Sequence, residues 1–272
     1  TEHLKEKGID IVHALEGVGK NLQDHLEIYI QHESKKPETL YGLFNNPFLK
    51  VYSGVQWFLF KKGLLSHSHL ELGGFVKSHS KYKQPNIQFH FFPSLIYNHG
   101  LTNPDKHGFQ FHASPNRPTS RGFVKLRSNN PNDNPKIQFN YLETEEDKQQ
   151  MRDCVKIARE IFCQPTFKDY VGKELRPGKN VEYDEVLDEI IRNTSDTAYH
   201  PSCTNKMGTD AMAVVNEETK VHGISNLRVV DSSIMPDIVS GNINAATFMI
   251  GEKASDMILG KKEQPLDVET YN

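Results

Sequence analysis

The chain has 272 residues, which is long enough for one large hydrophobic core or two smaller ones. Its 32 Lys and Arg residues against 35 Asp and Glu residues give a net charge of -3, and no basic run favours a phosphate backbone, so nucleic acid is not an expected partner. The three cysteines, Cys154, Cys163 and Cys203, lack CxxC spacing, which argues against a disulfide framework or a zinc ribbon and favours a reducing compartment.

We expect no secretion signal or transmembrane helix within these residues. The opening TEHLKEKGID has no starting methionine and no apolar signal core, and it is typical of the amphipathic end of a helix. We therefore expect the chain to start inside a longer protein. The most apolar late run, AATFMIGEKASDMIL, is interrupted by Glu252 and Lys253, so no transmembrane segment is expected.

Alternation of apolar and polar residues predicts several strands in the first half of the chain. They are expected at 25–33, 86–92, 107–113, 121–128 and 136–140. Asn-, Pro- and Asp-rich turns separate them, as in SNNPNDNP, so we expect an antiparallel meander with one covered face.

Helical spacing predicts two helices in the middle of the chain. In 144–164 the apolar residues form one stripe, Thr144 stands at the N-cap position and acidic residues follow it, so this helix should pack on the sheet. The segment 47–63 is an aromatic-rich second candidate ending at Gly63, although its apolarity also permits a buried strand.

From about Ser195 onward the sequence pattern differs from that of the preceding residues. LRVVD is expected to form a short buried strand ending in Asp231, and a helix should begin beyond Asn242 after the Gly241 turn. The amino end of that helix would point its N–H groups at the polar junction between strand and helix. This arrangement suits a ligand that carries or develops a negative charge.

Several motifs in order resemble the C-terminal half of the glucose–methanol–choline (GMC) oxidoreductase family, and most closely its choline-oxidising dehydrogenases. They are GVGKNLQDHLEIYIQ, LELGGF, IQFHF, GFVKLRS, YHPSCTNKMG and LRVVDSSIMPDIVSGNINAATFMIGEK. The family's dinucleotide fingerprint GxGxxG is absent from these residues, so the resemblance implies that the main FAD cradle lies upstream.

The fold class expected on these grounds is α+β, an antiparallel sheet with packed helices plus the C-terminal strand-loop-helix part of an FAD-binding α/β domain. The resemblance implies four segments: 1–25 as the end of the FAD-binding part, 26–194 as the substrate-binding domain, 195–262 as the return to the FAD-binding domain, and 263–272 as a mobile tail.

The resemblance also implies the reaction and its residues. His200 of the HP motif would act on the alcohol while FAD accepts the hydride, and an imidazole with a pKa near 6.5 suits the proton transfer. Asn242 would be its partner and would also contact the cofactor, and Asp231 would lie beside the FAD ribityl or phosphate groups. From pattern alone, Asn242 is equally a helix cap and Asp231 a turn residue.

Asn242 favours the choline-oxidising branch, so oxidation of choline to betaine aldehyde is the expected function. Glu71 aligns with the carboxylate that reads the substrate's cation in choline-oxidising relatives, and Tyr199 is placed to offer an aromatic face. Without the resemblance, Glu71 would be a solvated strand residue and Tyr199 a packing residue.

Two other functions stay open: a GMC enzyme for another alcohol or sugar, and a non-catalytic fragment that has lost its flavin. No metal is expected, because the histidines on alternating strands give no compact ligand set. The segments HLEIYIQ and YHPSCT resemble the corresponding segments of mitochondrial members of the family, and this resemblance implies a mitochondrial location. The electron acceptor is not predicted.

Overall fold

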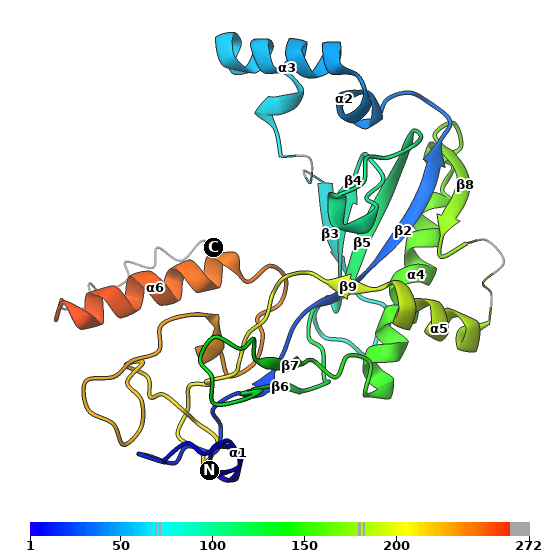
Figure 1. Cartoon of the computed structure of the whole chain (residues 1–272). Helices are drawn as coiled ribbons and strands as arrows, with labels where there is room; N and C mark the ends of the chain where they lie inside the picture. The colour runs from blue at the N-terminus through cyan, green and yellow to red at the C-terminus, as the bar shows by residue number, and fades with distance from the viewer. Residues whose placement is uncertain (69, 71, 179–180, 182, 262–272) are drawn as a thin grey trace, which may run out of the picture. The chain divides into compact units, whose positions relative to one another are not determined.

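The computed structural model describes residues 1–68, 70, 72–178, 181 and 183–261 (Figure 1). The chain divides into two compact units, and each unit is built from segments that are far apart in the sequence. Unit 1 comprises Thr1–Asp24, Ser120–Tyr141 and the described residues from Tyr199 onward. Unit 2 comprises His25–Thr119 and Leu142–Ala198.

Unit 2 is organised around a six-stranded antiparallel sheet with the order β3-β4-β5-β2-β8, to which β9 is added beside β2. Its strands are β2 (Leu26–Ser34), β3 (Leu72–Val76), β4 (Ile87–Phe92), β5 (Gly108–Pro115), β8 (Val171–Arg176) and β9 (Asp196–Thr197). The three strands expected at 25–33, 86–92 and 107–113 are confirmed as β2, β4 and β5. Alternation found them because one sheet face is apolar and the other polar.

Helix α4 (Glu145–Phe162) packs on the apolar face of this sheet, as Figure 1 shows, and the prediction for 144–164 is confirmed. Thr144 caps the helix by accepting the N–H of Asp147 at 3.3 Å, and three acidic residues follow in the first turn. At the other end, the Phe162 ring stacks 4.6 Å from Phe111 and lies 5.4 Å from Phe109 between ring centroids. Helix α5 (Asp184–Thr194) buries Leu187 and Ile191.

Helix α3 (Pro47–Phe60) confirms the helical interpretation of 47–63 and excludes the buried strand. It follows α2 (Tyr41–Asn45), and Asn46 caps it by accepting the N–H groups of Phe48 and Leu49. Most of its apolar side chains are exposed, whereas Ser53 is buried. Short 3-10 turns follow at η1 (Leu64–Ser66), η2 (Asn98–Gly100) and η3 (Pro165–Phe167).

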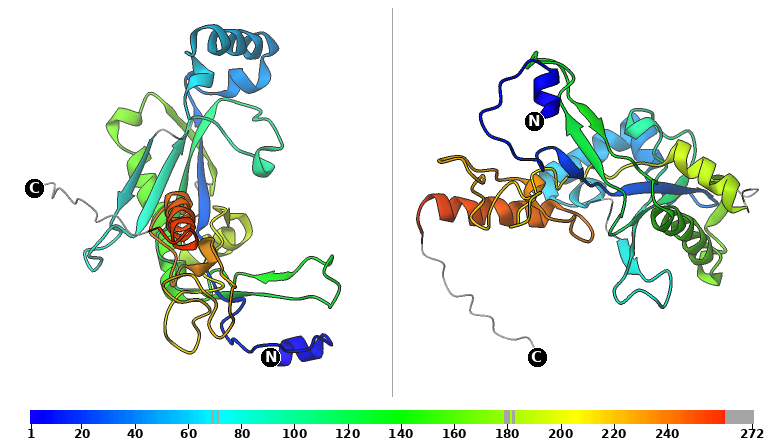
Figure 2. Two further views of the ribbon diagram at one scale, coloured as in Figure 1. Left: turned by 90° about the vertical axis from the view of Figure 1, so that its left-hand side faces the viewer. Right: turned by 90° about the horizontal axis from the view of Figure 1, so that it is seen from below.

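Unit 1 begins with α1 (Glu2–Glu6) and contains a small antiparallel sheet with the order β1-β6-β7. The strands are β1 (Lys20–Leu22), β6 (Gly122–Lys125) and β7 (Lys136–Gln138), so the strands expected at 121–128 and 136–140 are confirmed. Figure 2 shows β6 and β7 as a projecting hairpin. Gly122 is required at the open end of the hairpin, because a Cβ there would lie 2.0 Å from the Gln138 carbonyl oxygen.

The predicted strand at 227–231 is wrong. Within the described residues this segment has an isolated bridge between Lys220 and Arg228 and two backbone bonds to the same neighbour, from Val229 N–H to the Thr219 carbonyl and from Val221 N–H to the Leu227 carbonyl. An apolar run forms a strand only when an adjacent backbone continues the ladder, and Leu227 is exposed instead of buried. The segment leads directly into η4 (Ser232–Ile234).

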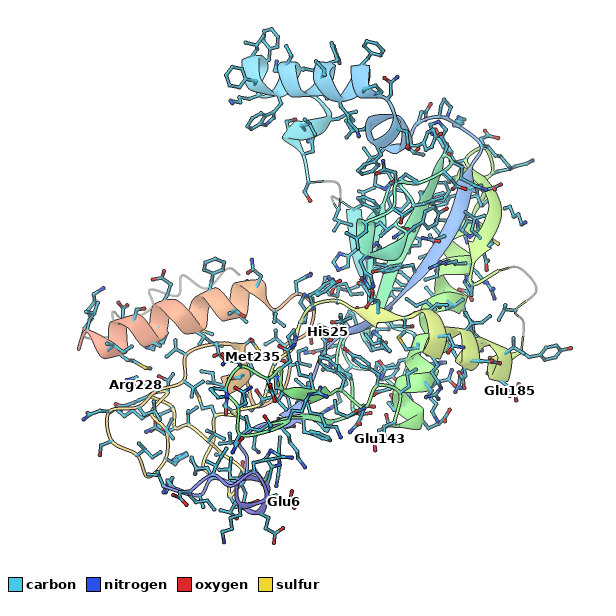
Figure 3. All side chains as sticks on the ribbon, viewed as in Figure 1. Glu6, His25, Glu143, Glu185, Arg228 and Met235 are labelled. Carbon is cyan, nitrogen blue, oxygen red and sulfur yellow. The ribbon has the colours of Figure 1, made fainter. Side chains whose placement is uncertain are left out.

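Helix α6 (Asn244–Ile258) begins just beyond Asn242, as predicted. An apolar cluster joins its first turns to the chain before it: buried Cys203, Met235 and Ile238 pack with Ile243 and with Ile250 of the helix. Figure 3 labels Met235, which lies beside α6 in this cluster. The cluster fixes the loop between η4 and α6 against the loop that contains Cys203.

The mixed α+β class with antiparallel sheets is confirmed. The functional names of the four sequence segments stay predictions, and the structure groups 120–141, placed within 26–194 from the sequence, with unit 1. The expected tail 263–272 lies outside the described residues. In the part of the chain that the structure describes, the helices are too short or too polar to cross a membrane.

Candidate functional site

His200 stands in an irregular loop of unit 1 whose backbone is unusual. The residue before it, Tyr199, has a φ of 61°, a left-handed conformation that is uncommon for a bulky side chain. The residue after it, Pro201, has no N–H and disfavours helical backbone at His200. The loop therefore cannot be part of a helix, which accounts for the sequence pattern around the HP pair. His200 as a whole residue is half-buried.

Asn242 lies on the second loop of unit 1, between the Gly241 turn, where φ is 77°, and the start of α6. Its amide Nδ2 is 3.5 Å from His200 Nε2. The structure therefore brings together two residues that stand far apart in the sequence and that were expected to act as a pair.

The spacing of this pair has a chemical consequence. Two nitrogen atoms 3.5 Å apart can both lie within hydrogen-bond distance of one hydroxyl oxygen. The amide N–H would donate to that oxygen, and Nε2 would accept the hydroxyl proton when the ring carries its own proton on Nδ1. The pair can thus hold an alcohol and take its proton.

The amino end of α6 is two residues beyond Asn242. Ile243 at the N-cap position has no side-chain acceptor, and the first turn contains no acidic residue. The first N–H groups of a helix lack partners inside the helix and carry partial positive charge. An uncapped helix end beside the His200–Asn242 pair favours negative charge on a bound group.

Asp231 is a turn residue, as its sequence pattern predicts. Its carboxylate accepts the N–H of Ser233 at 2.7 Å and so caps η4, and its side chain is exposed. This bond occupies one oxygen. The cofactor role of Asp231 stays a prediction.

The two expected substrate residues have different outcomes. Tyr199 is 68% exposed, so its ring is not packed in the core of the described structure, and its role toward a substrate stays a prediction. Glu71 lies outside the described residues, next to the start of β3 at Leu72.

Cys203 packs in the apolar cluster against α6. Burial raises the pKa of its thiol to about 11. The thiolate is therefore scarce near neutral pH, so Cys203 is a poor nucleophile.

Unit 2 holds a buried polar chain that the sequence pattern did not reveal. The Ile96 N–H donates to Gln110 Oε1 at 2.8 Å, so the Gln110 amide nitrogen faces His112 Nε2 at 2.7 Å. His112 must then carry its ring proton on Nδ1, which lies 3.0 Å from Glu27 Oε1. Alternation placed these residues on a strand but could not show that their polar ends meet. Among the described residues, no cluster of three or more His, Cys, Asp and Glu side chains could hold a metal ion.

Comparison with known proteins places the chain in a family. Residues 118–251 match the family model described as GMC oxidoreductase. The chain is 48% identical over 264 residues to a protein from Vibrio vulnificus (strain YJ016) named oxygen-dependent choline dehydrogenase. A protein of the same name from Acinetobacter baumannii (strain AYE) is 47% identical over 266 residues. The chain belongs to the GMC oxidoreductase family.

The matched relatives are about twice as long as this chain. The matches cover 96% of the chain but only 47% of the Vibrio and Acinetobacter proteins, so the chain spans about half their length. Among solved structures, a formate oxidase from Aspergillus oryzae RIB40 has a TM-score of 0.87 at 24% identity and covers 96% of this chain and 50% of its own. A pyridoxine 4-oxidase has a TM-score of 0.78 at 24% identity over 96% of this chain and 47% of its own. These two structures support the fold.

The predicted mitochondrial location is wrong. The matched choline dehydrogenases come from Vibrio, Acinetobacter and Escherichia coli, which are bacteria and have no mitochondria. The amino-acid sequence of short motifs such as HLEIYIQ was the only basis for that prediction. Such motifs are shared by proteins with the same fold and do not indicate the cellular compartment.

Proposed function

We propose that this chain is the part of a flavin-dependent alcohol oxidoreductase that supplies the residues acting on the alcohol, and that the substrate is choline, oxidised to betaine aldehyde. The observation that carries the proposal is the 3.5 Å approach of His200 Nε2 and Asn242 Nδ2 in unit 1. The similarity to proteins named choline dehydrogenase supports the choice of substrate.

The oxidation removes a hydride from the alcohol carbon and a proton from its oxygen. His200 accepts the proton at Nε2, and such proton transfer contributes about 100- to 10,000-fold to a rate. Asn242 donates its amide N–H to the same oxygen and holds the hydroxyl in line with the ring. The residues of this chain thus orient the alcohol and take its proton.

FAD, when bound, supplies the acceptor for the hydride and its electron pair, which no side chain can store. The described residues fit such a group, because the amino end of α6 offers N–H donors with neither a side-chain cap nor an acid in its first turn. Asn242 and Asp231 would be further contacts for it. A carboxylate such as Asp231 can accept hydroxyl groups of a ribityl chain.

The cation of choline requires its own recognition. A quaternary ammonium has no N–H, so it is held by a carboxylate and by aromatic faces, each of the latter contributing about 0.5–2 kcal/mol. We assign the carboxylate to Glu71 and the aromatic face to Tyr199, which is exposed and adjacent to His200.

Anaerobic mixing tests the function in the full-length protein that contains this chain. Choline should bleach the bound flavin within seconds, and a sugar such as glucose should not. The uncharged isostere 3,3-dimethylbutanol separates charge recognition from general alcohol oxidation. Glu71→Gln should raise the KM for choline much more than the KM for 3,3-dimethylbutanol.

Each result has a clear consequence. Equal effects of Glu71→Gln on both substrates would leave a GMC enzyme for another alcohol. A protein that binds no flavin, or a flavin that no alcohol reduces, would contradict the catalytic role and favour the non-catalytic alternative.

A further inference from the structure

The segment Asn21–Asp24, which we call the clamp, contacts both loops that carry the His200–Asn242 pair, and all of these residues belong to unit 1. The segment lies within the motif GVGKNLQDHLEIYIQ, but no spacing rule reveals its role, because its loop partners lie 117 to 215 positions away. Gln23 and Asp24 are 2% and 3% exposed, so their polar groups are held inside the protein. Buried polar and charged groups are costly unless they are hydrogen-bonded, so the partners of these two side chains are informative.

Asp24 holds the backbone of His200 directly. Its Oδ1 accepts the N–H of His200 at 2.9 Å, and its Oδ2 accepts the hydroxyl of Tyr141. Both carboxylate oxygens are therefore engaged, and the side chain cannot rotate without breaking a bond. Because Pro201 has no N–H, the bond to Asp24 is the backbone anchor at the point where the imidazole leaves the chain.

Gln23 and Asn21 hold the neighbouring parts of the two loops. The backbone of Gln23 pairs with that of Ser202 through two bonds of 3.1 and 3.0 Å. The side-chain oxygen of Gln23 accepts the N–H of Ile238 at 3.2 Å, four residues before Asn242. The Asn21 amide donates to the carbonyl of Pro236 at 3.0 Å and faces that of Cys203 at 3.4 Å.

We propose that Asp24 is a positioning residue, which holds His200 at its working distance from Asn242 while Gln23 and Asn21 hold the loop that leads to Asn242. The inference rests on the proposed function, because it assigns the clamp to the alcohol-oxidising pair. The left-handed backbone of Tyr199 fits this role, since a strained residue persists only where its surroundings hold it in place.

Variants of the full-length protein test the proposal. Asp24→Ala removes both acceptors, and it should lower kcat for choline about 100-fold, the loss that a misplacement of about 1 Å produces. Its flavin content should stay unchanged, because the bonds from Asp24 to the His200 N–H and the Tyr141 hydroxyl hold the His200 loop and not the start of α6. Asp24→Asn keeps an oxygen that can accept the His200 N–H, so it should lose less than about tenfold. Tyr141→Phe should fall between the two.

Asp210→Ala is the matched control. Asp210 also accepts a backbone N–H, that of Met212 at 2.8 Å, but its side chain is exposed and pairs with Lys206. This variant loses a backbone N–H acceptor in an exposed turn that holds Met212 instead of His200, and its kcat should equal that of the wild type. If Asp24→Ala fails to fold, Asp24→Asn and Tyr141→Phe decide the question through the same ranking.

A second readout separates this proposal from the proposed function. The ring nitrogens of His200 should give one fixed tautomer in the ¹⁵N NMR spectrum of the wild type and averaged shifts in Asp24→Ala, whether or not choline is a substrate. Averaged shifts with an inactive wild type would keep the positioning role and reject the function. An active wild type with unchanged kcat and unchanged His200 shifts in folded Asp24→Ala would overturn the positioning role.

Discussion

The N-cap residue of α4 in unit 2 is Thr144, whose side chain accepts a backbone N–H, and three acidic residues follow it in the first turn. The N-cap residue of α6 in unit 1 is Ile243, which offers no side-chain acceptor, and no acidic residue follows in the first turn. The first arrangement satisfies the helix end from within the chain and stabilises it. The second leaves N–H groups available beside His200 and Asn242. One helix end is stabilised from within the chain, and the other has the open N–H groups that the proposed function requires for a ligand.

The largest effect is expected when α6 receives an acidic residue in its first turn, as α4 already has. Ala245→Glu places a carboxylate in the exposed first turn of α6, where it should stabilise the helix by about 0.3–1 kcal/mol. The same charge should weaken flavin binding about tenfold, equivalent to about 1.4 kcal/mol, because it competes for the N–H groups. Flavin titration of the full-length apoprotein measures this.

Ala245→Gln is the control for that change, because it has the same size without the charge. Its flavin affinity should stay close to that of the wild type. Equal flavin affinity in the Glu and Gln variants would show that the end of α6 does not contact the flavin.

Removing the side-chain cap of α4 should lower stability and leave catalysis unchanged. Thr144→Ala should cost about 1 kcal/mol of unfolding free energy and leave alcohol oxidation unchanged, since the cap serves the fold alone. Urea unfolding and steady-state kinetics of the full-length protein check both statements. Thr166→Ala, an exposed threonine of η3, should change stability by less than about 0.5 kcal/mol. A loss of kcat in Thr144→Ala would remove the distinction between the two helix ends.

A smaller contribution to stability, which depends on pH, comes from His32 at the carboxyl end of α4. His32 packs 4.7 Å from Phe162 between ring centroids, and burial lowers the pKa of its imidazole, outweighing the Gly172 carbonyl and Glu174, which raise it. The unfolded chain, with a pKa near 6.5, binds the proton first as pH falls. This contribution to stability is therefore complete above about pH 6.5 and is lost as pH falls from there toward the lower folded pKa.

His32→Phe should be less sensitive to acid than the wild type over that interval, since it keeps an aromatic ring and has no proton to gain. Urea unfolding at pH 7.5 and at successive values below 6.5 measures the difference, with the exposed His67→Phe as control. A wild type and a His32→Phe variant with parallel pH profiles would contradict the burial argument.

The sequence was informative where the deciding interactions are local. Thr144, the acids after it and the apolar stripe lie within one helix, so α4 could be predicted with its cap. The strand at 227–231 could not be judged from its apolar run, because a strand also needs a neighbouring backbone, which the sequence does not show.

The same reason limits the prediction of the site. His200 and Asn242 were found through family motifs and are indeed adjacent, but their supports were missed. Asp24 and Tyr141 each contact a residue more than 100 positions away, and no spacing rule connects them. The polar chain from Gln110 to Glu27 was hidden for the same reason.

The central claim is that His200 takes the proton of the alcohol, and one measurement tests it most directly. The rate of flavin reduction by choline is measured by anaerobic rapid mixing in the full-length wild type and in His200→Ala. The control is His222→Ala, another histidine of unit 1, whose ring bonds to the Gly208 carbonyl at 3.0 Å. We expect a loss of about 100-fold or more in His200→Ala with the flavin retained, and no loss in His222→Ala. A loss of less than about tenfold in His200→Ala would contradict the claim.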